Sequence, residues 1–77
     1  MDNGRDEDED LLSMAQRHVI EAEEHVARQN ALIKDLERDT HAKAAEQARV
    51  VLRTLQQSLE LARDHLRRER IRRGMGP

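Results

Sequence analysis

The sequence predicts an all-α protein, a two-helix antiparallel coiled-coil hairpin that dimerises into a four-helix bundle. Two observations lead to this prediction. Apolar residues recur at alternating steps of three and four in two separate stretches, which is the spacing of a heptad repeat. Gly and Pro are scarce, with three and one among 77 residues, so a turn-rich β fold is excluded.

Residues 1–9 are predicted to form a disordered acidic tail, because this stretch is rich in Asp and Glu and has almost nothing to bury. We expect the first helix to span about residues 10–38. Asp8 or Asp10 is suited to cap it, and the acidic run complements the positive end of the helix dipole.

Each helix of the predicted hairpin carries a seam of eight heptad positions, of which seven are apolar. In the first helix the seam consists of Leu12, Ala15, Val19, Ala22, Val26, Gln29, Ile33 and Leu36. In the second helix, about residues 43–73, it consists of Ala45, Ala48, Leu52, Leu55, Leu59, Ala62, Leu66 and Glu69. Gln29 either fixes the register of the helices or reaches water at the seam edge.

The turn is predicted at about residues 39–42, where Asp39 and Thr40 are typical helix-starting residues and no large apolar residue occurs. Gly74 follows the second helix and should end it near Arg73, which leaves residues 74–77 as a flexible tail. The hairpin therefore occupies residues 10–73. When it is folded, each seam alanine faces a larger residue, which is an arrangement that packs closely.

Some apolar residues lie outside the seam. Leu11, Leu32 and Val51 share one flank of it at the same heptad position. A seam thinned by alanine buries too little to order two helices alone, so this flank is predicted to contact a second copy of the chain. Association with an unidentified protein partner is an alternative.

Four histidines raise the question of a metal site. His18, Glu21, His25 and His65 are the candidate ligands. However, His18 and His25 are two helical turns, about 10 Å, apart along the axis, too far to share one ion directly. We therefore predict no metal or other cofactor. Another interpretation is a pH response, because protonating both His18 and His65 would make them repel each other.

The end of the second helix is rich in arginine, which suggests contacts to phosphate groups. The candidates are Arg67, Arg68, Arg70, Arg72 and Arg73. The net charge of the chain is −2 and no aromatic residues are interleaved, so nucleic-acid binding is only the alternative to protein–protein contact. No catalytic arrangement of Ser, His and acidic residues is recognisable, so the protein is not expected to be an enzyme. No apolar run exceeds three residues, so we expect no membrane contact and a cytoplasmic location.

Six residues carry a resemblance to a known group: His18, Glu23, Gln29, Ala48, Val51 and Leu52. In spacing they resemble a family of short, uncharacterised alphaproteobacterial helical-hairpin proteins of a rhizobial type. The resemblance covers about residues 15–68 and implies a bacterial hairpin protein, with no activity attached to it. At the turn that family usually has a Gly followed by Asp-Thr, an arrangement that this chain lacks.

Overall fold

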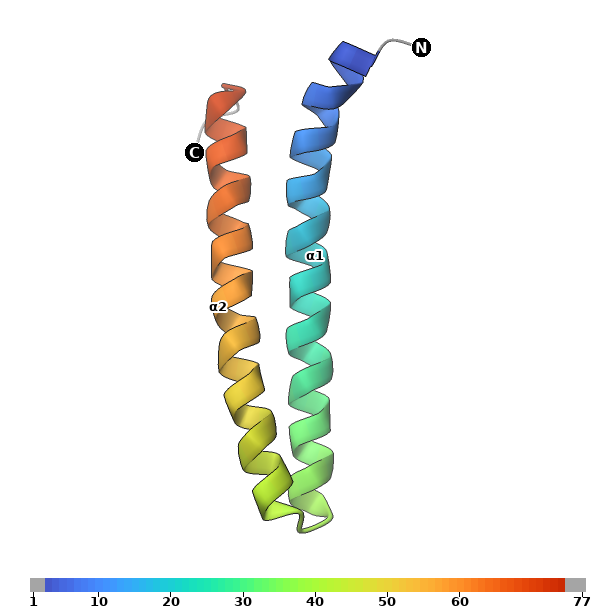
Figure 1. Ribbon diagram of the computed structural model, residues 1–77, viewed down its shortest axis with the longest axis vertical. Coiled ribbons are helices and arrows are strands. Elements are labelled where there is room, and N and C mark those ends of the chain that lie inside the picture. The colour runs from blue at the N-terminus through green and yellow to red at the C-terminus, as the bar shows by residue number, and fades with distance from the viewer. Residues whose placement is uncertain (1–2, 75–77) are drawn as a thin grey trace.

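The computed structural model is a hairpin of two long helices, α1 (Asn3–Arg38) and α2 (Ala42–Arg72). It describes residues 3–74, with side chains described from residue 11 onward. The helices run antiparallel and side by side, and the two chain ends lie at the same end of the molecule (Figure 1). The extents of 54 × 28 × 13 Å are those of a single layer of helices. The prediction of an all-α hairpin is confirmed.

The N-terminal boundary of α1 corrects the sequence prediction. The helix begins at Asn3, so residues 3–9 are helical rather than a disordered tail, and Asp8 and Asp10 lie inside the helix instead of capping it. Residues 1–2 of the predicted tail lie outside the described residues. Acidic residues are favourable in the first turns of a helix, and extending an existing helix is far less costly than starting one. These first turns lean away from the end of α2 (Figure 1).

The turn between the helices is closed by backbone hydrogen bonds. The Thr40 N–H donates to the Glu37 carbonyl at 3.2 Å, and the His41 N–H donates to the Leu36 carbonyl at 2.8 Å. This pair of bonds is the Schellman motif, which requires a left-handed residue just past the helix end. Thr40 takes that conformation, with φ of 60°. A β-branched residue there is strained, since its Cβ crowds the following carbonyl group.

The start of α2 also differs slightly from the prediction. α2 begins at Ala42, one residue before the expected start, and its N-cap is His41 rather than Asp39 or Thr40. The His41 side chain makes no capping hydrogen bond. Asp39 and Thr40 cannot serve as caps because both belong to the end of α1 and its Schellman turn.

At the other end, α2 stops where the sequence predicts. Arg73 is the C-cap, and Gly74 has a φ of 76°, in the left-handed region that glycine adopts without strain. The Gly74 N–H donates to the Ile71 carbonyl at 2.9 Å, which is half of a second Schellman turn. Residues 75–77 of the predicted flexible tail lie outside the described residues.

The core is the seam between the helices, and it is thin. The buried apolar residues are Ala15, Ile33, Ala45, Ala48 and Leu59. The other seam residues are half-buried: Leu12, Val19, Ala22, Val26, Gln29, Leu36, Leu52, Leu55, Ala62, Leu66 and Glu69. Among residues 11–74, three of the five buried residues are alanines, so much of the apolar surface in the seam stays in contact with water.

Over residues 3–74, neither helix contains a stretch long and apolar enough to cross a bilayer.

Candidate functional site: the two flanks of the seam

One polar residue ties the helices together inside the seam. The Gln29 Nε2 atom donates a hydrogen bond to the Ala48 backbone carbonyl at 2.8 Å, and this contact is partly buried. Of the two interpretations that the sequence left open, the structure favours fixing of the register, because the amide is bonded to the backbone of the other helix. A shift of one helix along the other would break this bond.

One flank of the seam is held by ion pairs. Arg63 Nη2 lies 3.4 Å from Glu23 Oε2, and Arg49 pairs with Glu37. In both pairs the two residue numbers have the same sum, as an antiparallel register requires. We call Glu23, Glu37, Arg49 and Arg63 the ion-pair flank. All four side chains are about half exposed, between 45% and 51%, so the pairs orient the helices more than they stabilise them.

The other flank has a different chemistry. Each of its residues stands one position before a seam residue. Along each helix such residues recur every seven positions. They are Leu11, His18, His25 and Leu32 on α1, and Ala44, Val51, Ser58 and His65 on α2. We call these eight residues the histidine flank. All eight are exposed, and none is Asp, Glu, Lys or Arg.

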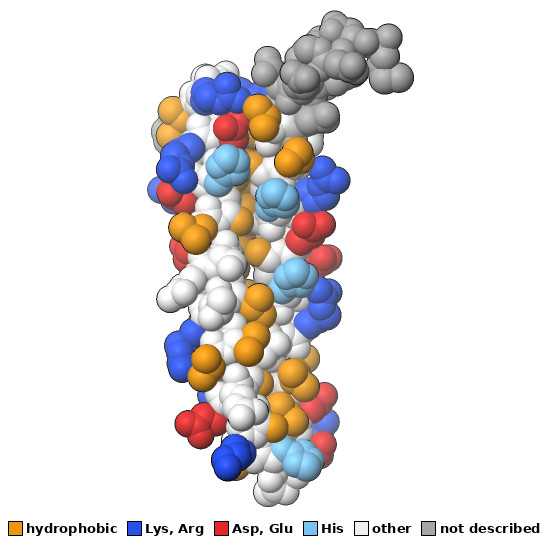
Figure 2. Space-filling view, viewed as in Figure 1, with side chains coloured by type: hydrophobic (Ala, Val, Ile, Leu, Met, Phe, Trp, Pro, Cys, Tyr) orange, Lys and Arg blue, Asp and Glu red, His pale blue; other side chains and the backbone are white. Residues whose placement is uncertain are grey.

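The apolar members of the histidine flank are the three that the sequence predicts as a dimer contact. Leu11 is 42% exposed, Leu32 45% and Val51 48%. Histidine and hydrophobic side chains gather over both helices on the face shown in Figure 2, whereas many charged side chains lie at its two edges. The next position in the α2 series is Arg72, whose Nη2 lies 2.8 Å from Glu69 Oε1. The histidine flank is thus an uncharged strip that ends in an ion pair.

The metal candidates do not form a ligand set. His18, Glu21, His25 and His65 are all exposed. Among the described side chains, no three His, Asp or Glu residues converge closely enough to hold a metal ion. The three candidate histidines therefore lie along one flank of the seam rather than around a single metal position.

The arginines at the end of α2 face carboxylates of their own helix. Arg67 and Arg68 each lie 3.4 Å from an oxygen of Asp64. Arg73 is half-buried, and its Nε and Nη2 atoms have no hydrogen-bond partner among the residues that the structure describes. The other predicted phosphate contacts are exposed: Arg67, Arg68, Arg70 and Arg72. Because intrahelical carboxylates partly neutralise this cluster, it presents less positive charge than its sequence suggests.

Glu69 closes the seam at the open end of the hairpin. Its side chain is only 13% exposed. The hydrogen bond from Arg72 lowers the pKa of this carboxyl group, burial opposes that effect, and the charges of Arg72, His65 and Arg73 lower the pKa further. Glu69 therefore keeps its negative charge near the end of the histidine flank.

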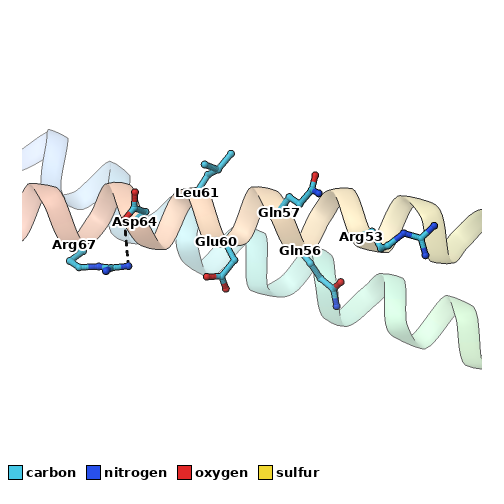
Figure 3. A pocket seen from close by; sticks show the side chains of 7 residues that line it. All are labelled: Arg53, Gln56, Gln57, Glu60, Leu61, Asp64 and Arg67. Carbon is cyan, nitrogen blue, oxygen red and sulfur yellow. Dashed lines mark ion pairs between the residues drawn. The ribbon is translucent and has the colours of Figure 1, made fainter.

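A shallow depression lies on the outer side of α2. Figure 3 shows the side chains that line it: Arg53, Gln56, Gln57, Glu60, Leu61, Asp64 and Arg67. All of them come from one helix, and Leu61 is 69% exposed. A ligand site normally encloses most of its ligand between apolar walls. This open surface of a single helix offers no such enclosure.

Two features of the site go beyond the sequence prediction. The ion-pair flank was not predicted, although a signal for it exists: Glu23 and Glu37 directly follow seam positions, as do Arg49 and Arg63, at matching intervals. The bond from Gln29 ends on a backbone carbonyl, and no residue type in the sequence indicates such an acceptor.

Compared with protein-family models, curated proteins and solved structures, the chain has no significant match. The resemblance to short alphaproteobacterial proteins therefore stays a prediction.

Proposed function

We propose that the protein is a self-associating helical module, in which two hairpins pack into a four-helix bundle and act through protein–protein contact rather than catalysis. The observation that carries this proposal is the thin core. The described buried residues larger than alanine are Ile33 and Leu59. Helices of this length gain most of their stability from tertiary packing, so a second layer of helices supplies what the seam lacks.

The exposed surface of the chain supports the same conclusion. A folded monomer of 9.0 kDa is expected to expose about 4,850 Å². This chain exposes 5981 Å², an excess of about 1,100 Å² over that expectation. A standard protein interface buries about 800 Å² on each partner. Packing of a second hairpin on one face would therefore bring the surface close to that of an ordinary globular protein.

Sedimentation equilibrium of the full chain at micromolar concentration tests the proposal. We expect a mass twice the 9.0 kDa of one chain, with a helical circular dichroism spectrum. A folded helical monomer throughout the concentration series would contradict the proposal, since the hairpin would then be stable without a second layer.

The sequence leaves two rival functions, and each has its own test. For phosphate or nucleic-acid binding through the end of α2, a mobility shift of DNA or RNA at low salt is the expected sign. For metal binding, it is a rise in melting temperature on titration with zinc. Self-association predicts neither a mobility shift of nucleic acid nor a rise in melting temperature with zinc. The carboxylates beside Arg67, Arg68 and Arg72 and the separation of the histidines favour self-association over both.

A further inference from the structure

We infer that the histidine flank is the surface on which two copies of the chain pack, and that acid separates them. This inference rests on the self-association proposed above, and it adds the contact surface and its regulation.

The occupant of the histidine flank follows from its charge. In a symmetric dimer each surface meets a copy of itself, so a charge near the two-fold axis would face its own copy. The histidine flank carries no formal charge while its histidines are neutral, and Leu11, Leu32 and Val51 leave about half of their surface free. It therefore fits its own copy, whereas it offers a strongly charged partner nothing to pair with.

The dimensions of the histidine flank also suit a second copy. From Leu11 to Leu32 the flank extends about 32 Å at 1.5 Å per residue. Two adjacent helices are together about 20 Å wide. The resulting footprint of about 640 Å² is that of the whole two-helix face on which the flank lies, and it approaches the roughly 800 Å² that a stable interface buries on each side. The ion-pair flank offers no equivalent surface, because its charges would have to lose their water.

Acid would change this interface through its histidines. His18, His25 and His65 from each copy would lie between two hairpins, in surroundings poorer in water than the free surface. Histidine becomes positively charged as the pH falls below about 6.5. Placing these charges in one interface with their counterparts from the second copy would be unfavourable, because like charges then lose solvent together.

Fixed charges of both signs lie on α1 near these histidines. Glu21 lies one turn from both His18 and His25, and Arg28 lies one turn beyond His25 on the same side of the helix. The attraction of Glu21 for a protonated His25 is therefore offset in part by the repulsion from Arg28. His18 has Arg17 beside it in the sequence.

The charges on α2 balance in a similar way. His65 is one turn from Arg68 and from Glu69, which is hydrogen-bonded to Arg72. Asp64, next to His65 in sequence, lies near Arg67 and Arg68. Each of these carboxylates already has an arginine close by, so protonation of the histidines adds net positive charge to the flank.

The first experiment measures the dissociation constant of the full chain by sedimentation at about pH 7.5 and about pH 5.5, on either side of the ordinary histidine value. We expect dissociation to be at least about tenfold easier at the lower pH, which corresponds to one pKa unit of coupling. Equal dissociation constants at the two pH values would overturn the inference and leave the proposed dimer intact. A monomer at both pH values would overturn both.

A variant with His18→Gln, His25→Gln and His65→Gln isolates the cause. Glutamine keeps a polar side chain but cannot gain a charge, so this variant should stay dimeric at both pH values. His41→Gln is the matched control, since His41 lies in the turn and outside the histidine flank; this variant should keep the full pH response. A triple variant that still separates in acid contradicts the inference.

A second pair of variants locates the surface independently of pH. Leu32→Glu puts a charge in the histidine flank and should weaken the dimer at neutral pH, which is measured as a higher dissociation constant. Ile20→Glu is the control, because Ile20 is 55% exposed on another face of α1, and it should leave the dimer unchanged. Circular dichroism checks that each variant is helical, and Val51→Glu replaces Leu32→Glu if the latter is unfolded. A dissociation constant that neither flank substitution raises overturns the assigned surface.

Discussion

The Gln29 side chain of α1 is hydrogen-bonded to the backbone carbonyl of Ala48 in α2, at 2.8 Å, in a seam whose other polar residue is Glu69 at the open end of the hairpin. We predict that Gln29→Ala lowers the free energy of unfolding by about 1–2 kcal/mol, because both the hydrogen bond and the packing of the side chain are lost. Gln29→Leu should be nearly neutral or stabilising, since a carbonyl already bonded within its helix tolerates an apolar neighbour. Urea denaturation measures both variants. Equal losses in the two variants would show that the hydrogen bond, and not packing, dominates at this position.

Thr40 should be a site where substitution stabilises the hairpin. Its φ of 60° costs a non-glycine residue about 1–2 kcal/mol. Thr40→Gly removes this cost but makes the unfolded chain more flexible, so we expect a net gain of about 0.5–1 kcal/mol. Asp39→Gly is the control, since among the described residues Thr40 alone combines a positive φ with a residue other than glycine. That control should destabilise, and a loss of stability in both variants would contradict the strained turn.

Leu59 and Leu61 make a pair that compares the seam with the outer surface of α2. Leu59 is 8% exposed and Leu61 is 69% exposed. Leu59→Ala should lower the free energy of unfolding by about 2–4 kcal/mol, because it leaves a cavity in a small core. Leu61→Ala should cost less than about 1 kcal/mol. Thermal melts at equal concentration measure both, and a large effect at Leu61 would indicate a second contact surface on that side.

Glu69 should make the stability depend on acid. Arg72 holds the pKa of Glu69 below its ordinary value of 4.5, so the folded state binds this proton less readily than the unfolded state. The stabilisation is thus complete above about pH 4.5 and disappears as the pH falls through the lower pKa of the folded state. Glu69→Gln should be less stable than the natural chain at neutral pH, and the difference should vanish in strong acid. A difference that stays constant with pH would show that packing rather than charge sets the effect.

Much of the fold could be predicted from the sequence, because a seven-residue apolar repeat depends only on local spacing. The seam residues, the antiparallel arrangement and the end of α2 at Gly74 all follow from such local signals. The turn was harder to predict. Thr40 occupies a position that normally takes Gly or Asn, so residue preferences indicated a helix start where α1 in fact ends.

Other parts of the structure depend on how the two helices pack against each other. The helical state of residues 3–9 depends on α1 continuing outward from its packed part, and their composition alone favours disorder. The pairing of Glu23 with Arg63 requires the register of the two helices, as does the bond from Gln29. The heptad spacing already places Leu11, Leu32 and Val51 on one flank of the seam. The exposure of these residues and of the histidines at the same heptad position depends on how the two helices pack, and the structure shows it.

The strained residue at the turn also bears on how two chains can exchange parts. If Thr40 and His41 both took right-handed helical backbone angles, α1 and α2 would join into one continuous rod and the strain at Thr40 would be released. Two such rods can lie against each other and reproduce every seam contact, with each chain's second helix docked on the first helix of its neighbour. Strain at Thr40 therefore raises the free energy of the closed hairpin relative to such an exchanged pair.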